Sequence, residues 1–170
     1  MKKYLKEYDL EKQLFGKINR NFRENRTLSD EEFFKIIIWK SNRVKGKVLE
    51  GIRKSKKSVK QIMRDVYNVK IPEEKIKILT SIKGIGLPIA SAILTVCYPN
   101  KFTILDYRVW DILFKDKKVK SKNPPKTISE YLDYVDICKN YAKKLKLSLR
   151  DFDRAMWGRS FNEDLKKFLK

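Results

Sequence analysis

Two glycines near the middle of the chain are spaced so that a phosphate group could approach the backbone. Gly84 and Gly86 are one residue apart, between an apolar segment that ends near Ile82 and another that follows Pro88. Glycine lets main-chain amides come close to a ligand, and proline suits the first turn of a helix, whose free N–H groups and positive dipole end attract anions. Lys83 adds a positive charge. We therefore expect this hairpin to bind phosphate, with a purely structural turn as the alternative.

The residues around this hairpin resemble the helix-hairpin-helix motif, which contacts the DNA backbone without sequence specificity. The resemblance rests on LTSIKGIGLPIA at residues 79–90, within a motif that would cover about residues 73–98. It implies that main-chain and side-chain groups of the hairpin contact a DNA phosphate. The residues expected to bind the DNA backbone are Lys83, Gly84, Ile85, Gly86, Leu87 and Pro88.

An aspartate, Asp106, follows Pro88 by eighteen residues, in the segment FTILDYRV. This spacing resembles the helix-hairpin-helix DNA glycosylases of the endonuclease III and adenine mismatch glycosylase superfamily, over about residues 73–111. In that family the target nucleotide is flipped out of the duplex, and an aspartate helps to break the N-glycosidic bond by stabilising the cationic sugar or orienting a water. The resemblance implies that Asp106 is catalytic. A helix N-cap is the alternative role.

The chain departs from the bifunctional members of this family at Pro88. Those members carry a lysine nucleophile at the corresponding position, two residues after the second glycine, and proline has no amine with which to form a Schiff base. Lys83 is another amine of the hairpin, but its place before Gly84 suits a phosphate contact better. The resemblance therefore implies a monofunctional glycosylase, which removes a base and leaves an intact abasic strand.

Two further segments are weaker candidates for DNA contacts. Asn42 and Arg43 follow a helix that ends in Trp39, where family members carry a polar loop that fills the gap left by the flipped base. An ordinary helix connection is the alternative. The stretch from Arg150 to Arg159 could close the cleft or form a surface cluster of ion pairs.

Three aromatic residues could stack on an extruded base. They are Tyr107, Trp110 and Trp157. Because aromatic residues at helical spacing more often belong to a core, a core position is the alternative for each of them.

The charge balance favours a polyanionic partner. The 170 residues include 41 basic and 21 acidic side chains, which gives a net charge of +20. This charge exceeds what solubility requires, and the electrostatic field that it creates attracts nucleic acid. Double-stranded DNA is therefore the expected partner, and a Lys-rich composition of the kind found in thermophiles is the alternative explanation.

Several classes of protein are excluded by composition. With no histidine and only Cys97 and Cys138, one chain cannot assemble a Cys/His zinc site, a four-cysteine iron–sulfur cluster or a disulfide framework. No metal site or cofactor is expected, apart from a monovalent cation at the hairpin, which is left open. No apolar run is long enough to cross a membrane, and no cleavable signal is recognisable, so we expect a cytoplasmic monomer.

The apolar spacing predicts an all-α fold made of one helical domain, residues 1–170, with two lobes that flank a cleft. Predicted helices follow the capping box at Ser29, Val44, Val59, Pro72 and Pro88. Further helices are expected after Asp106, over about residues 129–146 and after Ser148, and a short last helix is expected to begin at Asn162 after a break at Gly158.

Together these observations predict a DNA-binding base-excision repair protein, a monofunctional DNA glycosylase in which Asp106 is catalytic. The chief alternative is a catalytically silent helix-hairpin-helix protein that only holds duplex DNA. A basic RNA-binding helical protein would explain the charge but not the arrangement from Gly84 to Asp106.

Overall fold

The computed structural model describes residues 8–169, which fold into helices without a β-strand. The all-α prediction is confirmed. The elements are α2 (Leu10–Gln13), the π-helical turn η2 (Leu14–Ile18), α3 (Asn19–Asn25), α4 (Asp30–Ser41), the 3-10 turn η3 (Asn42–Val44), α5 (Lys45–Ser55), α6 (Val59–Asn68), α7 (Pro72–Thr80), α8 (Leu87–Cys97), α9 (Tyr107–Lys115), α10 (Ile128–Lys144) and α11 (Leu149–Phe168).

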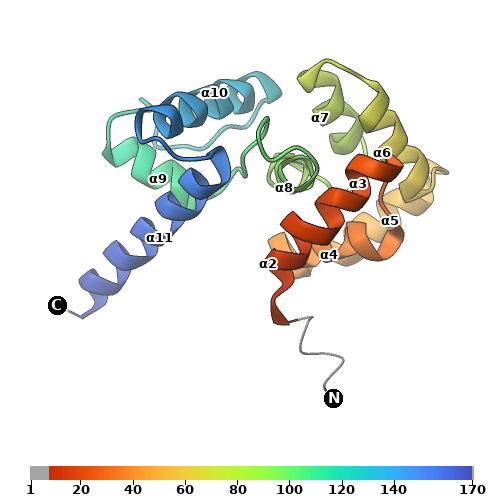
Figure 1. The fold of residues 1–170 in the computed structure, drawn as a ribbon, viewed down its shortest axis with the longest axis horizontal. Helices are drawn as coiled ribbons and strands as arrows, with labels where there is room; N and C mark the ends of the chain where they lie inside the picture. Colours follow the sequence, from red (N-terminus) through yellow and green to blue (C-terminus); the bar gives the residue numbers. More distant parts are fainter. Residues whose placement is uncertain (1–7, 170) are drawn as a thin grey trace.

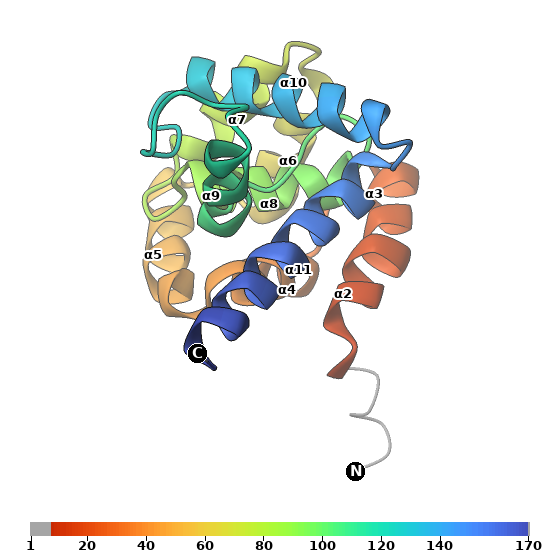
Figure 2. The ribbon, with the colours of Figure 1, turned by 90° about the vertical axis from the view of Figure 1, so that its left-hand side faces the viewer.

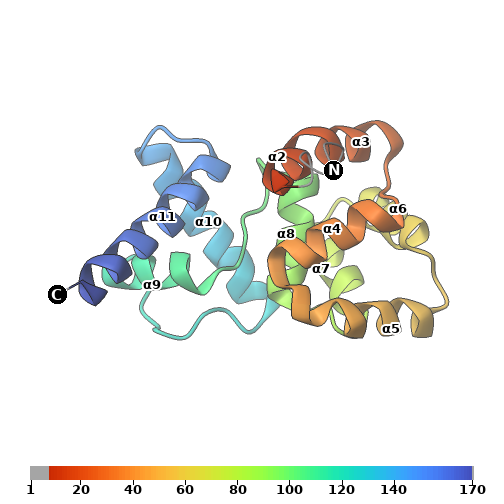
Figure 3. The ribbon, with the colours of Figure 1, turned by 90° about the horizontal axis from the view of Figure 1, so that it is seen from below.

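The helices form two groups on either side of α8. Helices α2 to α7 gather on one side, and α9, α10 and α11 gather on the other (Figures 1 and 3). Within the second group, α10 lies above α9 and α11 in two perpendicular views (Figures 1 and 2). The two groups are joined through α8 and the segment that follows it, residues 98–106.

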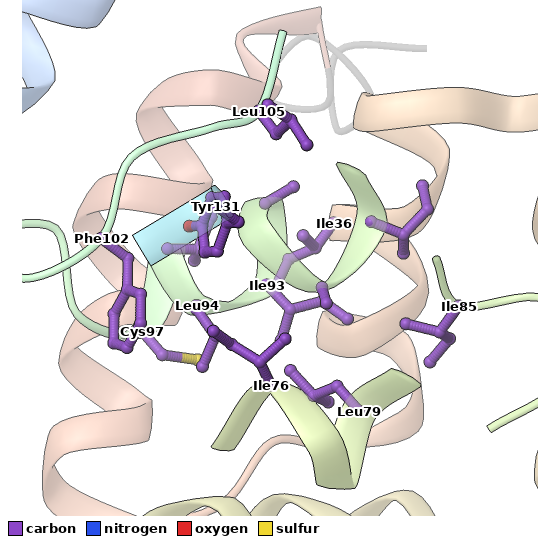
Figure 4. Close-up of a cluster of buried hydrophobic side chains, with 14 of the residues drawn as sticks. Ile36, Ile76, Leu79, Ile85, Ile93, Leu94, Cys97, Phe102, Leu105 and Tyr131 are labelled. Carbon is purple, nitrogen blue, oxygen red and sulfur yellow. The ribbon is translucent and has the colours of Figure 1, made fainter. Parts of the chain in front are cut away.

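Helix α8 is the centre of the hydrophobic core. Every residue from Ile89 to Cys97 is buried, which is expected for a helix that is apolar on all sides. Its side chains Ile93 and Leu94 pack among residues of α4 and α7 and of the segment leading to Asp106 (Figure 4). The core therefore holds the hairpin at one end of α8 and the Asp106 segment close to its side.

Helix starts follow the local signals in the sequence. Ser29 Oγ accepts a hydrogen bond from the Glu32 N–H at 3.2 Å, and Glu32 accepts one from the Ser29 N–H at 2.9 Å, which completes the predicted capping box. Helix α7 begins at Pro72, as predicted, and α8 has Pro88 in its first turn.

The predicted break near the C-terminal end is wrong. Helix α11 runs without interruption from Leu149 to Phe168, so that Gly158 and Asn162 both lie inside it. A glycine in an exposed helix costs only about 1 kcal/mol relative to alanine. Here Arg159 bonds Glu163 one turn later at 2.9 Å and also bonds Asp116, which supports the helix beyond the glycine.

Candidate functional site

A pocket of about 440 Å³ opens between the two groups of helices. Helix α11 lines one side of it, and α2 and α4 line the other (Figures 1 and 3). The lining residues are Glu11, Trp39, Lys40, Ile104, Asp106, Arg150, Asp153, Arg154 and Trp157. Of the residues predicted for the site, Asp106 and Trp157 are therefore in the pocket.

Asp106 is held in place on both of its carboxylate oxygens. It is the N-cap of α9, where Oδ1 accepts a hydrogen bond from the Arg108 N–H at 3.0 Å. Its Oδ2 accepts a hydrogen bond from Lys40 Nζ at 2.9 Å. The predicted N-cap is confirmed, and the carboxylate also forms an ion pair that the cap does not require.

The segment before Asp106 is anchored by three hydrogen bonds from neighbouring helices. Ser91 of α8 accepts one from the Leu105 N–H at 2.9 Å. Tyr131 and Tyr134 of α10 each donate one, to the carbonyls of Thr103 and Ile104, at 2.8 Å. Because the backbone is fixed on both sides, the direction of the Asp106 side chain is set by the core.

Lys40 reaches the pocket from the last turn of α4. Its side chain is 15% exposed and that of Asp106 is 21% exposed, so the ion pair is largely withdrawn from water. In the sequence, Lys40 opens the polar segment 40–43 in which Asn42 and Arg43 are the candidates for filling the gap left by a flipped base. Nothing local marks it as functional, because its partner is 66 residues further along the chain.

Arg150 and Asp153 of α11 form the charged wall of the pocket. Arg150 donates to Asp153 and, at 2.8 Å, to Glu11 of α2. Its guanidinium also lies over the ring of Phe15 at 4.4 Å. The stretch from Arg150 to Arg159 therefore forms ion pairs and also contributes to the pocket lining.

Asp153 is almost completely buried, and its ionisation is affected by its neighbours. Burial raises the pKa of Asp153 to about 6, and the nearby charge of Asp106 acts in the same direction, whereas Arg150 and Lys40 oppose the rise. A carboxyl group that changes its protonation state near neutral pH thus lies in the same pocket as Asp106.

The three aromatic candidates have different environments. Trp157 lines the pocket, is 45% exposed and stacks on Phe161 with ring centroids 5.7 Å apart. Tyr107 is 68% exposed and does not line the pocket. Trp110 is buried and its indole N–H donates to the Ser121 carbonyl, so it belongs to the core. Among the three candidates only Trp157 lines the pocket, where Trp39 of α4 is a further aromatic side chain.

The hairpin between α7 and α8 lies outside the pocket lining and packs on α5. Gly84 has a φ of +92°, and a Cβ atom there would lie 2.7 Å from the Lys47 carbonyl carbon. A Cβ at Gly51 of α5 would lie 2.1 Å from the Lys83 carbonyl oxygen. Gly84 is therefore required by the turn and by its contact with α5.

Gly86 differs from Gly84, because nothing in the protein requires a glycine there. Its φ of −88° and ψ of 177° suit any residue, and the atom nearest to an added Cβ is 3.8 Å away. The residue is exposed at the N-terminus of α8. Among residues 8–169, the N–H groups of Gly84 and Gly86 donate to no backbone carbonyl. The exposed backbone of this turn is thus open to an external acceptor.

The side chains of Ile85 and Lys83 in the hairpin differ in their exposure to solvent. Ile85 is 3% exposed and packs in the core (Figure 4), and its N–H donates to the Ile82 carbonyl at 3.0 Å. Lys83 is exposed and forms an ion pair with Glu50 at 3.0 Å. Hydrogen bonds from Lys54 and Lys83 hold the pKa of Glu50 well below its usual range. A phosphate would therefore compete with Glu50 for the Lys83 ammonium group.

Asn42 and Arg43 lie in η3, immediately after Lys40 and its neighbour Ser41. Both side chains are exposed, and neither lines the pocket. Asn42 Oδ1 accepts a hydrogen bond from Lys45 at 2.8 Å. Asn42 and Arg43 are therefore close to Lys40 in sequence, but they do not contact Asp106.

Residues 8–169 contain neither a candidate metal site nor a membrane-spanning helix. No three or more histidine, cysteine or carboxylate side chains are clustered so as to hold a metal ion. In the same residues, no helix has the length and apolar character needed to cross a membrane. In comparisons with known proteins, no family model, curated protein or solved structure matches this chain.

Proposed function

We propose that the protein is a DNA glycosylase that removes a damaged or mismatched base after the nucleotide has been flipped out of the duplex. The observation that carries this proposal is the fixed carboxylate of Asp106 at a pocket of about 440 Å³. Ligand sites for small organic groups have volumes of roughly 300–1,000 Å³. A nucleobase is a small organic group of this kind.

The proposed chemistry assigns the charge-stabilising role to Asp106. As the N-glycosidic bond breaks, positive charge develops on the sugar, and a carboxylate held beside it stabilises the transition state or orients the attacking water. The two hydrogen bonds to Asp106 keep the group in place without reorganisation during the reaction. Trp157 lines the pocket, and a base that stacks on it would compete with the Arg108 guanidinium, which lies over its ring at 5.5 Å.

The hairpin supports the proposal as a site for the DNA backbone. The open position of Gly86, the free N–H groups of the turn and the start of α8 suit a phosphate oxygen. The net charge of +20 would draw duplex DNA to this surface from a distance. Because Ile85 is buried and its N–H is bonded to the Ile82 carbonyl, we assign the phosphate contact to the glycines and the start of α8 rather than to Ile85.

The test is a panel of duplexes that each contain one lesion: uracil, a thymine mismatch, an alkylated purine, hypoxanthine or oxidised guanine. Each is incubated with the protein, treated with alkali and examined for strand breakage. We expect breakage for at least one lesion. Tight duplex binding with no base released from any of them would instead favour a catalytically silent DNA-binding protein. Preference for structured RNA over duplex DNA would favour an RNA-binding protein.

A further inference from the structure

Lys40 places a primary amine directly against the carboxylate of Asp106. The two groups are 2.9 Å apart, both side chains are largely buried, and both line the same pocket. An exposed ion pair between flexible side chains contributes little free energy and is weak evidence for a function. This one joins the end of α4 to the start of α9 and lies at the position where the proposed reaction occurs.

The product of the proposed base removal has a functional group that reacts with amines. Loss of a base leaves an abasic deoxyribose, whose ring opens to an aldehyde at C1′. Amines condense with aldehydes to form Schiff bases. The protein thus holds an amine against the carboxylate that is assigned to the reaction producing this aldehyde.

We propose that Lys40 is a catalytic nucleophile, which captures the abasic sugar as a Schiff base and cleaves the strand on the 3′ side. The inference rests on the proposed function for the source of the abasic site. It adds a lyase step after base removal, in place of the intact abasic strand expected from Pro88.

The step needs no group beyond Lys40, Asp106 and water. Asp106 accepts a proton from the Lys40 ammonium, and the neutral amine attacks C1′, so that a C–N bond forms while the carbonyl electron pair moves to oxygen and is protonated. Loss of that oxygen as water gives the iminium ion. Asp106, ionised again once water has left, takes a C2′ proton, and the electrons of that C–H bond form the C2′–C3′ double bond as the C3′–O bond breaks and the 3′-phosphate leaves. Hydrolysis of the remaining imine returns the free amine and releases an unsaturated aldehyde.

The other basic groups of the site are less suited to this role. Arg150 and Arg154 also line the pocket, but guanidinium groups stay protonated in proteins and are poor nucleophiles. Lys83 does not line the pocket and is paired with Glu50. Among the residues that line the pocket, Lys40 is the one amine.

The experiment is borohydride trapping on a duplex that already contains an abasic site. Wild type is compared with Lys40→Arg, which keeps a positive charge beside Asp106, and with Lys40→Met. The matched control is Lys139→Met, because Lys139 is an exposed lysine of α10 paired with Asp136 and lies outside the pocket. We expect a covalent protein–DNA complex with wild type and the control. Both Lys40 variants should trap about a hundredfold less, as expected for loss of a nucleophile held at the reacting carbon.

Two results would overturn the inference: no covalent complex with wild type, or equal trapping by a folded Lys40→Arg variant. If both variants fail to fold, peptide mapping of the wild-type complex decides, because an adduct at Lys40 supports the inference and an adduct at another lysine overturns it. Abasic DNA bypasses base removal, so these outcomes do not depend on the lesion panel. Base release without trapping at Lys40 would remove only the lyase step.

Discussion

At the residue scale, the pocket contains charged side chains whose protonation states depend on one another. Asp153 is buried beside Arg150, and the charges of Asp106 and Lys40 also act on it. Because burial disfavours the ionised carboxyl, the folded protein holds a proton on Asp153 at pH values where the unfolded chain has lost it. Asp153 therefore links the stability of the fold to pH in a direction opposite to that of most carboxylates.

We expect Asp153→Asn to remove this pH dependence. The rise in pKa from 3.8 to about 6 corresponds to about 3 kcal/mol. Between these values the folded state binds more protons than the unfolded state, so the contribution of Asp153 to stability falls as pH rises through the window and is constant above it. Urea unfolding at several pH values measures it: the wild-type stability, taken relative to the variant, should fall across this range. A constant difference between the two proteins would show that Asp153 titrates normally.

Single residues could be assigned from sequence only where the signal is local. Asp106 was predicted as an N-cap, and the structure confirms that role. Lys40 could not be assigned, because its ion pair with Asp106 arises only when the two groups of helices come together. Pro88 and Lys83 lie in the hairpin, so the local sequence speaks against a Schiff base there and says nothing about Lys40.

At the element scale, the two glycines of the hairpin have different roles: Gly84 is needed for the fold, and Gly86 is proposed to let a phosphate approach. Gly84 fits a left-handed turn and a close contact with the backbone of α5. Gly86 has an ordinary conformation and no neighbour closer than 3.8 Å to an added Cβ. Replacement of Gly84 is therefore expected to cost stability, whereas replacement of Gly86 is not.

We expect the two alanine variants of the hairpin to differ. Gly84→Ala should lose about 2 kcal/mol or more of stability, because of its positive φ and overlap with α5. Gly86→Ala should keep its stability within about 0.5 kcal/mol but lose about tenfold in duplex affinity, the effect of one lost hydrogen bond to a charged group. Gly16→Ala, at an exposed glycine with open space around it, is the control. Melting temperature and fluorescence anisotropy measure the two effects, and full affinity of Gly86→Ala would exclude phosphate capture at that position.

Helix starts were predictable and one helix end was not. Caps such as Ser29 and prolines such as Pro72 act within one turn, so their effect is visible in sequence. The stop assigned to Gly158 was wrong because contacts with α9 and the pairing of Arg159 maintain α11 beyond it. No helix was predicted over residues 10–25, although Leu14, Ile18 and Phe22 recur every four residues and are buried.

At the scale of the whole molecule, the pocket combines residues from both ends of the chain. Glu11 and Arg150 are 139 residues apart in sequence and 2.8 Å apart in the structure. The all-α class followed from apolar spacing, but the pairing of α2 with α11 depends on how both groups pack around α8. The charge of +20 is the basis of the proposed DNA partner, and the pocket is the basis of the proposed base removal.

The most direct test of the central claim is single-turnover base release by wild type and Asp106→Asn, on the lesion that the panel identifies. Asparagine keeps an oxygen for the N-cap and nearly the same shape. Because the pair with Lys40 is largely withdrawn from water, its loss should cost about 3 kcal/mol, and melting temperature checks that the variant is folded. Asp136→Asn, at an exposed aspartate of α10, is the control. We predict that Asp106→Asn releases the base about a hundredfold more slowly, or slower still, while its duplex affinity is retained. An unchanged rate in the folded variant would contradict the assignment of Asp106 as the catalytic residue.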